Sequence, residues 1–237
     1  MEKDIFGKAL EAYYNGALDA VLKVESDTVD TEEWPVAIFF HNGDYAMQPK
    51  ELRALTLASG RTLDVGAGSG CHALWLQDHG VDVEALDFSP AAAKVMRCRG
   101  VRRVHEGDFF AFQPAEAFDT VLLLMNGTGI AGTLDRLGRL LAKAKSLLSP
   151  GGQILVDSTD LIYLYEEEDG SYSLPIGGRY YGEMSYTYVF RGERSDEFSW
   201  LFVDQRTLAD AAQAAGLSFE VVFEGDNCDY LARLVAK

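Results

Sequence analysis

Cysteine and long apolar runs are both scarce in this sequence of 237 residues. The three cysteines, Cys71, Cys98 and Cys228, are far apart and form no CxxC pair. This argues against a disulfide framework and fits a reducing cytoplasm. No apolar run approaches the roughly 20 residues that a membrane helix needs, and the opening MEKDIFGKAL lacks the pattern of a secretory signal. We therefore expect a cytoplasmic protein with no membrane segment.

Positive charge is also scarce, with 21 Lys and Arg against 37 Asp and Glu and a net charge of −16. Such a surface repels phosphate backbones and anionic membranes, which disfavours nucleic acid as a partner. Two short charge runs, the arginines within 97–103 and the acids of 166–169, are interpreted as a solvated helix end with its turn and a solvated hairpin end. The length suits one α/β domain with an insertion or a cap.

What the sequence does contain is a glycine-dense turn between an apolar run and a helix-like run. Residues 64–70 read DVGAGSG, and the helical pattern follows over residues 71–78. Glycines allow a sharp turn and a close approach of a ligand, and the amides that open the next helix point into the turn. The spacing is GxGxG, with Cys71 where a dinucleotide-binding fold has its third glycine. Together with Asp64 before the turn, this favours a positively charged adenosine ligand over NAD.

Strand and helix patterns alternate from about residue 61. A strand is predicted from about residue 61 to Asp64, with further strands over 81–87, 101–105, 118–125 and 153–158, and helices over 71–78, 90–99 and 134–148. This repetition predicts a parallel sheet with helices on both faces. A helix over 207–215 and a hairpin of strands 219–223 and 230–236 close the chain.

Two segments fall outside this alternation. Residues 1–60 show helical periodicity over 4–24, a polar loop over 25–33 and a helix from Pro49, so we expect a helical cap. Residues 160–203 contain period-2 segments at 161–165, 183–191 and 197–203, which predicts an antiparallel β insertion. The aromatic residues of this insertion either line a pocket or pack the sheet.

Polar residues stand at the ends of four successive predicted strands. They are Asp64, Asp87, Asp108 and Asn126. In a doubly wound sheet, ligands bind beyond the carboxyl ends of the strands. A carboxylate at Asp87 can accept hydrogen bonds from both ribose hydroxyls, or it can cap a helix. Asp108 can accept from an adenine amino group while Phe109 packs on the ring, or it is a simple loop acid. Asn126 serves a ligand or a turn.

Four segments together resemble the successive motifs of the class I S-adenosylmethionine-dependent methyltransferases. They are residues 63–70 (LDVGAGSG), 85–89 (ALDFS), 106–109 (EGDF) and 147–152 (LLSPGG). The resemblance spans about residues 61–158 and implies a doubly wound, seven-stranded, mostly parallel sheet with a C-terminal antiparallel hairpin. It also implies S-adenosylmethionine as cofactor and S-adenosylhomocysteine as product. The residues implied at the cofactor are Asp64, Gly66, Ala67, Gly68, Gly70, Asp87, Phe88, Asp108, Phe109 and Asn126.

The resemblance also implies roles within that site. The glycine turn lies against the methionine part of the cofactor, and Asp64 approaches the methionine amino group directly or through water. Asp87 holds the ribose, while Asp108 and Phe109 hold the adenine. The resemblance implies a methyltransferase domain over 61–237 with a cap at 1–60. In the family, segments such as 1–60 and 160–203 often build the acceptor site.

Methyl transfer from a sulfonium is an in-line displacement that mainly needs positioning and exclusion of water. A general base is needed only if the acceptor is protonated at pH 7. The sequence therefore names no catalytic residue, and we predict no metal ligands. His41, Asp157 and Asp160 are candidates for the acceptor, with a surface turn as the alternative for His41. His72 lies either near the cofactor or on a helix surface.

We expect the acceptor to be a small molecule. The fourth strand ends in Met-Asn-Gly-Thr rather than in the Asn/Asp-Pro-Pro-Tyr/Phe signature of DNA amino methyltransferases. A protein or RNA acceptor stays open. An NAD(P)-dependent oxidoreductase is disfavoured by Cys71 and the terminal hairpin, and a cofactor-binding protein without catalysis is a further alternative. The sequence sets neither the acceptor atom nor the oligomeric state.

Overall fold

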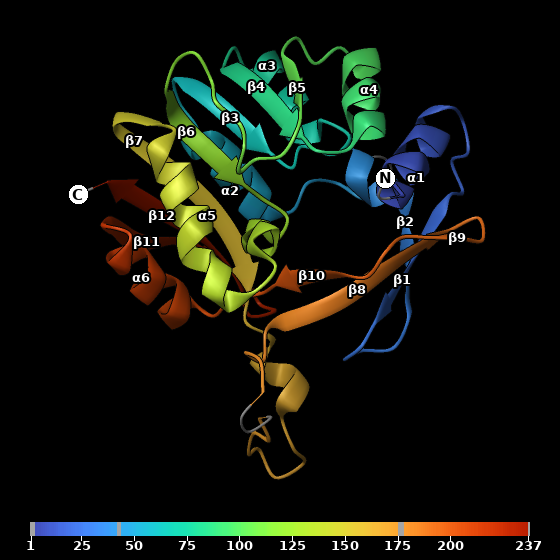
Figure 1. Cartoon of the computed structure of the whole chain (residues 1–237), viewed down its shortest axis with the longest axis vertical. Coiled ribbons are helices and arrows are strands. Elements are labelled where there is room, and N and C mark those ends of the chain that lie inside the picture. The colour runs from blue at the N-terminus through green and yellow to red at the C-terminus, as the bar shows by residue number, and fades with distance from the viewer. Residues whose placement is uncertain (1–2, 42–43, 175–177, 237) are drawn as a thin grey trace.

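Two β-sheets organise the computed structural model, which describes residues 3–41, 44–174 and 178–236 (Figure 1). The larger sheet has seven strands in the order β11-β12-β7-β6-β3-β4-β5, and the smaller has five, with β9 beside β8 in the order β10-β8-β1-β2. The two sheets lie side by side, and the smaller one packs with the N-terminal helix at the right of the view. Among the described residues, no helix combines the length and the apolarity that crossing a membrane requires.

The seven-stranded sheet is the predicted doubly wound sheet. Its strands are β3 (Arg61–Val65), β4 (Asp82–Asp87), β5 (Val104–Glu106), β6 (Phe118–Leu123), β7 (Leu148–Thr159), β11 (Leu217–Glu224) and β12 (Asp229–Ala236). Strands β3 to β7 pair in parallel, and β12 is antiparallel to both β7 and β11. The fold class, with its C-terminal antiparallel hairpin, is therefore confirmed.

Helices cover both faces of this sheet. They are α2 (Pro49–Leu57), α3 (Cys71–Asp78), α4 (Pro90–Arg99), α5 (Leu134–Ser146) and α6 (Gln205–Ala214). On one face, buried side chains of α5 and α6 such as Leu140 and Leu208 pack with Val121 of β6. On the other face, Leu55 and Leu76, from α2 and α3, pack with residues such as Leu122. Because successive residues of β6 point to opposite faces, its consecutive apolar residues 121–123 serve the two cores alternately.

The five-stranded sheet joins two distant parts of the chain. Its strands are β1 (Val21–Ser26), β2 (Glu32–Pro35), β8 (Glu183–Phe190), β9 (Glu193–Arg194) and β10 (Phe198–Leu201). All pairings are antiparallel, and Val24 of β1 faces Tyr188 of β8. Helix α1 (Ile5–Tyr14) packs on this sheet and on α4. Strands β8 and β10 lie within the period-2 segments predicted at 183–191 and 197–203, and β1, the partner strand of β8, comes from the N-terminal segment.

The N-terminal segment contains two strands in addition to the predicted helices. The helix expected over 4–24 ends at Tyr14, and Gly16 follows with a left-handed φ of 102°. Strand β1 replaces the last part because Leu22 and Val24 alternate inward while pairing with β8. The loop expected over 25–33 contains the end of β1 and the start of β2. The helix from Pro49 is confirmed as α2.

Two further boundaries differ from the prediction. Residues 161–165, predicted as a strand, form the 3₁₀ helix η3 (Leu161–Tyr165), because the Asp160 side chain accepts from the amide of Ile162 and caps it. Strand β7 begins at Leu148, the predicted last residue of the helix 134–148, rather than at the predicted start of the strand at residue 153. The short helices η1 (Val36–Phe40) and η2 (Gly127–Ala131) complete the described elements.

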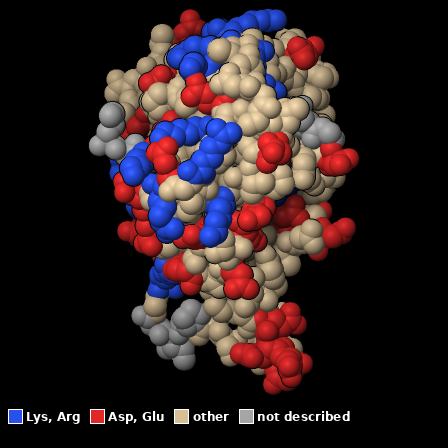
Figure 2. Space-filling view, turned by 90° about the vertical axis from the view of Figure 1, so that its right-hand side faces the viewer, with Lys and Arg blue, Asp and Glu red and all other residues tan. Residues whose placement is uncertain are grey.

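Lys and Arg gather on the face that includes α1, where acidic partners bind them (Figure 2). Lys8 of α1 lies 2.6 Å from Glu193, and Lys94 of α4 pairs with Glu11 of α1. These ion pairs bridge α1 to β9 and to α4. The acids of 166–169 are exposed, and an antiparallel bridge pairs Glu166 with Tyr172. Both observations agree with the predicted solvated hairpin end.

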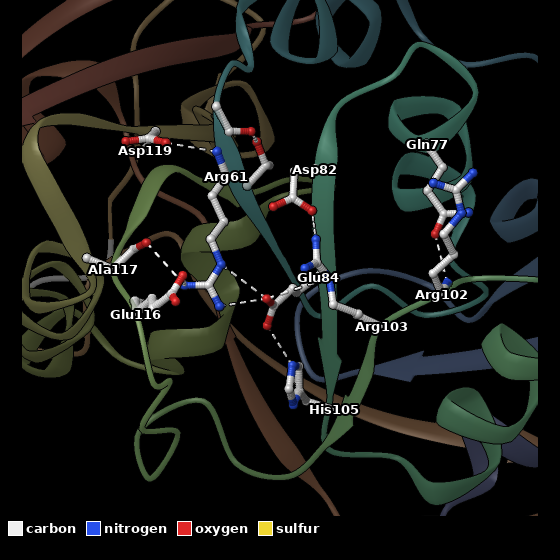
Figure 3. Close-up of polar contacts among 12 residues, drawn as sticks. Arg61, Gln77, Asp82, Glu84, Arg102, Arg103, His105, Glu116, Ala117 and Asp119 are labelled. Carbon is white, nitrogen blue, oxygen red and sulfur yellow. Dashed lines mark hydrogen bonds and ion pairs between the residues drawn. The ribbon is translucent and has the colours of Figure 1, made fainter.

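A buried acid, Glu84, sits in β4 towards the amino ends of the strands (Figure 3). Arg61 donates to Glu84 Oε1 at 2.7 Å, and His105 Nε2 lies 2.7 Å from Oε2. A buried carboxylate is tolerated when it is paired in this way. The cluster therefore supports the sheet at the end opposite to the glycine turn.

Candidate functional site

The glycine turn lies at the carboxyl end of β3, next to the end of β4. The amides of Gly66 and Ala67 donate to the carbonyl of Leu86, at 2.8 and 3.2 Å. Gly66, Gly68 and Gly70 have φ values of 69°, 55° and 83°, a region that favours glycine. A Cβ at Gly70 would also press on the side chains of α4 and its following turn, at 2.8 to 2.9 Å. The sequence motif is therefore a tight left-handed turn, and Gly66 is exposed beside it.

Asp87 connects the end of β4 to this turn. Its Oδ2 accepts from the amide of Gly68 and its Oδ1 from the amide of Ser89, both at 2.8 Å. The side chain is almost fully buried, and this burial raises the pKa of Asp87 to about 6 although the two amide hydrogen bonds oppose the shift. The structure thus brings Asp64, Asp87 and the glycines to one edge of the sheet, as the strand-end pattern predicts.

The other predicted adenine-side residues differ in exposure. Phe88 is 71% exposed, whereas Phe109 is 5% exposed and belongs to the core on the α5 face. Asp108 is exposed beyond β5, and its Oδ1 accepts from the amide of Phe110 at 3.0 Å. The roles of these three residues at an adenine stay predictions, and Phe88 and Asp108 have surface free for contact.

Asn126 lies in a strained turn after β6. Met125 and Asn126 both have a φ of 59°, which costs about 1–3 kcal/mol at each non-glycine residue. Asp157 holds the turn, because its Oδ1 accepts from the amides of Asn126 at 2.8 Å and Gly127 at 3.3 Å. Thr159 donates to Asn126 Oδ1 at 2.9 Å. The turn is therefore fixed by strand β7.

Asp157 has a cationic partner that the sequence did not reveal. Lys50, in the first turn of α2, lies 3.1 Å from Asp157 Oδ2 and 3.3 Å from Asp229 Oδ2. Burial raises the pKa of Asp157 even though Lys50 and two amides oppose it. Burial alone would lower the pKa of Lys50, but Asp157 and Asp229 outweigh it and raise that pKa. The Asp157 carboxylate is thus engaged inside the protein.

Asp64 belongs to a buried polar cluster with residues of η1, α2 and α3. His72 Nδ1 lies 4.0 Å from Asp64 Oδ1, and His72 Nε2 lies 2.7 Å from Glu51 Oε1. His41 Nε2 lies 3.3 Å from the same Glu51 oxygen. Asp64 Oδ2 is buried and has no hydrogen-bond partner. His72 is buried beside Asp64 near the glycine turn and does not lie on a helix surface. The His41 side chain is 9% exposed, so His41 is not a surface histidine.

Burial and pairing shift the ionisation of this cluster. Burial raises the pKa of Asp64, and it would lower that of His72, but Glu51 and Asp64 outweigh it and raise the pKa of His72. Glu51 is also buried, yet its close contacts with the imidazoles of His41 and His72 hold its pKa below its usual range. Sequence reasoning missed Glu51. Its only signal was an acid three residues after Gln48, where the two form a capping box.

Asp160 opens the segment 160–203, where it caps η3. Its Oδ1 accepts from the hydroxyl of Tyr181 at 2.8 Å and from the amide of Ile162 at 2.9 Å. Burial and the bond to Asp160 raise the pKa of Tyr181. The three acceptor candidates therefore have different partners: Glu51 for His41, Lys50 and two amides for Asp157, and Tyr181 for Asp160.

Elements from both flanking segments cover the carboxyl edge of the large sheet. Ser89 donates to Asp4 at 2.6 Å, and Ser69 Oγ donates to the carbonyl of Phe39. On the other side, the indole of Trp200 occupies the space that a Cβ at Gly129 would need. Residues before 60 and after 160 thus cover part of this edge.

The small sheet and its neighbours present a continuous group of rings, here called the aromatic face: Phe6, Trp34, Phe39, Tyr186, Tyr188, Phe198 and Trp200. Phe6 contacts Phe39 at 4.9 Å between centroids, and Tyr188 contacts Phe198 at 4.8 Å. The face reaches the glycine turn, since Phe6 lies 3.9 Å from where a Cβ at Gly68 would be. It reaches η2 through Trp200. These rings therefore take part in the packing of the small sheet, and Tyr186, Tyr188 and Trp200 are also among the residues that the sequence offered as the lining of a pocket.

A family model described as a methyltransferase domain matches residues 39–221. A solved S-adenosylmethionine-dependent methyltransferase from Bacteroides fragilis, in complex with S-adenosyl-L-homocysteine, is 43% identical over 99% of this chain and 96% of its own, with a TM-score of 0.91. The CcbJ methyltransferase from Streptomyces caelestis shares the fold, at 17% identity, a TM-score of 0.67 and coverage of 99% of this chain and 100% of its own.

A curated relative from Streptomyces venezuelae, dTDP-3-amino-3,4,6-trideoxy-alpha-D-glucopyranose N,N-dimethyltransferase, is 27% identical over 119 residues. The match takes in 48% of this chain and 50% of the relative, so the chain spans about half the length of that protein. The domain match and the fold agree with the motifs at 63–70, 85–89, 106–109 and 147–152. The chain therefore belongs to the methyltransferase domain family, with the fold of the class I S-adenosylmethionine-dependent methyltransferases.

Proposed function

We propose that this methyltransferase transfers the methyl group of S-adenosylmethionine to a small-molecule acceptor and releases S-adenosylhomocysteine. The observation that carries the proposal is the partly covered strand edge: residues of the N-terminal segment contact the glycine turn and the end of β4, and Trp200 of the inserted segment packs on η2. A cover of this kind excludes water and favours a small acceptor over a folded macromolecule. The Bacteroides relative with its bound product and the Streptomyces relative with a sugar substrate add support.

The residues at this edge fit the proposed cofactor. Asp64 Oδ2 is a buried carboxylate oxygen with no partner, a costly arrangement that the ammonium of a methionine group would relieve. Asp87, already braced by two amides, would accept from the ribose hydroxyls. Gly66, Ala67, Gly68 and Gly70 would line the methionine part, with Phe88, Asp108, Phe109 and Asn126 nearer the adenine and the reacting end.

The chemistry asks little of any one residue. S-adenosylmethionine brings a sulfonium whose positive charge already activates the leaving group. The protein then has to place the acceptor in line and keep water out. The aromatic face suits this task, because ring faces attract cations and apolar groups. We place the acceptor between this face and the turn at Asn126, so that 160–203 forms part of its site.

Of the three acceptor candidates, Asp160 fits a direct contact best. It is half-buried, and Tyr181 of the inserted segment orients it. Asp157 is engaged with Lys50 and two amides, so we infer that it acts through the turn 125–127. We also place the protein in the cytoplasm, a proposal supported by its three free cysteines.

Two experiments test the proposal. Calorimetry should show S-adenosylhomocysteine binding and no binding of NAD, and NAD binding alone would revive the oxidoreductase alternative. Methyl-tritiated S-adenosylmethionine, incubated with the enzyme and with separate metabolite, protein and RNA fractions of a cell extract, should label the metabolite fraction. Asp87→Ala serves as the control that loses this label. Label confined to protein or RNA would exclude a small-molecule acceptor, and no label in any fraction would favour a binding protein without catalysis.

A further inference from the structure

Three potential metal ligands converge beside the glycine turn. They are His41, which follows η1, Glu51 in the first turn of α2 and His72 in the first turn of α3. One ligand atom from each lies within 4.8 Å of the other two. All three side chains are buried, with 9%, 3% and 8% of their surface exposed. The three residues are 10 to 31 positions apart in the sequence, so the fold brings them together.

Hydrogen bonding leaves this cluster incomplete. Glu51 Oε1 faces both imidazoles, and His72 Nε2 makes the short contact of 2.7 Å. His41 Nε2 lies 3.3 Å from the same oxygen, and within the described part of the chain this buried atom has no hydrogen bond. A buried polar atom without a partner costs about 1–3 kcal/mol. A neutral imidazole nitrogen with a free lone pair is also a common metal ligand.

Acidic or amide groups lie behind two of the three ligands, one within hydrogen-bond distance and one at 4.0 Å. The amide of Gln48 donates to Glu51 Oε2 at 2.7 Å, which leaves Oε1 to face the histidines. Asp64 Oδ1 lies 4.0 Å from His72 Nδ1, so Nε2 points towards the cluster. A carboxylate behind a histidine is the usual support of metal-binding histidines in proteins.

We propose that His41, Glu51 and His72 bind a divalent transition-metal ion of the Zn²⁺ class. Two imidazole nitrogens and one carboxylate oxygen suit Zn²⁺ or a similar ion, whereas Mg²⁺ and Ca²⁺ prefer oxygen ligands. Tetrahedral ligands with bonds of about 2.0–2.1 Å stand roughly 3.3 Å apart. The His41–Glu51 distance of 3.3 Å meets this spacing, and the His72–Glu51 distance of 2.7 Å has to open slightly.

The ion would join the N-terminal segment to the large sheet. Three protein ligands leave one tetrahedral position for water or another small ligand. Asp64, the support of His72, also faces the proposed methionine subsite, so the metal site and the cofactor site share one residue. The three ligands stand at positions 41, 51 and 72, without a spacing typical of metal motifs, which is why the sequence predicts no metal ligands.

The test uses the full chain after removal of metal with a chelator. Titration calorimetry with Zn²⁺ should give one ion per chain, and bound Co²⁺ should give a visible absorption spectrum. Zn²⁺ should also raise the temperature of thermal unfolding, because an ion that binds only the folded state stabilises it. His41→Ala and His72→Ala should each weaken Zn²⁺ binding by about 100-fold or more, and Asp64→Asn by about 10- to 100-fold.

Matched controls come from the same chain. His79, which stacks on Trp75, and His105, which pairs with Glu84, lie outside the cluster, so His79→Ala and His105→Ala should keep full affinity. Cys98 and Cys228 are exposed thiols, so a C98S/C228S variant should also keep it. Circular dichroism confirms that each variant is folded.

Binding of less than one ion per chain would overturn the proposal, and so would unchanged affinity in folded His41→Ala. Loss of Zn²⁺ binding in C98S/C228S would assign the ion to the thiols instead. These readouts need no acceptor. S-adenosylhomocysteine binding, measured on the same samples, keeps the metal proposal separate from the methyl-transfer proposal.

Discussion

The two sheets differ in how far apart their strands lie in the sequence. In the seven-stranded sheet, strands β3 to β7 follow one another between residues 61 and 159, and helices α3, α4 and α5 lie in three of the four connections. In the five-stranded sheet, Val24 pairs with Tyr188 across most of the chain. Local motifs can encode the first arrangement, whereas the second depends on contacts that form only when the large sheet brings its flanks together.

The sheets also differ in the chemistry that they present. At its carboxyl edge the large sheet carries three buried carboxylates, Asp64, Asp87 and Asp157. They lie beside the glycine turn and the strained turn after β6. The small sheet presents rings. We propose from this comparison that cofactor binding depends on the local structure of the large sheet, whereas cover of the acceptor depends on the non-local small sheet. The predictions below test that division, beginning with the largest expected effect.

One leucine-to-alanine substitution in each sheet creates a comparable cavity and tests how each sheet contributes to stability. Leu22 of β1 and Leu63 of β3 are both completely buried, so Leu22→Ala and Leu63→Ala should each lower the free energy of unfolding by about 2–5 kcal/mol. Urea unfolding should remain a single transition in both variants, because Ala92 and Val95 of α4 belong to the core of the small sheet. A separate early transition in Leu22→Ala would show that the small sheet unfolds by itself.

Two glycines test the contact between the sheets. A Cβ at Gly129 would overlap the indole of Trp200, so Gly129→Ala should cost about 1–3 kcal/mol of unfolding free energy through overpacking. Gly138 in α5 is exposed and has no neighbour within 4 Å, so Gly138→Ala should be neutral or stabilising by up to about 1 kcal/mol. Thermal and urea unfolding measure both. Equal effects would mean that Trp200 does not hold the sheets together.

The two ends of β4 test the division within the large sheet. Asp87→Ala should weaken S-adenosylhomocysteine binding by about 1–3 kcal/mol, the value for hydrogen bonds to a charged group. Asp82→Ala, at the exposed start of the same strand, removes an ion pair with Arg103 and should leave this affinity unchanged. Calorimetry compares the two. An unchanged affinity in Asp87→Ala would remove Asp87 from the cofactor site.

The smallest effect is a pH dependence. Burial raises the pKa of Asp87 from its ordinary 3.8 to about 6, so the carboxylate protonates as the pH falls through 6. We expect S-adenosylhomocysteine binding to weaken by up to about tenfold for each pH unit below that value. In the free protein the sign is opposite: the raised pKa stabilises the fold below pH 3.8, and this contribution is lost as the pH rises through 6.

Calorimetry at pH 5, 6 and 7.5 measures this change. Asp87→Asn, which cannot ionise, should show a flatter profile. An equally steep profile in Asp87→Asn would assign the titration to another group.

The local signals in the sequence were sufficient where an element is built from its own neighbours. Ser89 and Pro90 predict the start of α4, and the Ser89 hydroxyl does accept from the amide of Ala92. The same reasoning was wrong where long-range pairing decides. Residues 21–24 fit a helical pattern, but β8 recruits them as a strand, and residues 161–165 alternate like a strand but form a capped 3₁₀ helix.

The sequence by itself determined the glycine turn, the parallel sheet and the meeting of Asp64 with Asp87, because carboxyl ends of neighbouring parallel strands share one edge. Only the tertiary structure decided that Lys50 pairs with Asp157, and that His41 and His72 converge on Glu51. Sequence patterns report the burial and the periodicity of one element at a time. Ion pairs, metal ligands and the join between two sheets depend on how separate elements pack, and no local pattern contains that information.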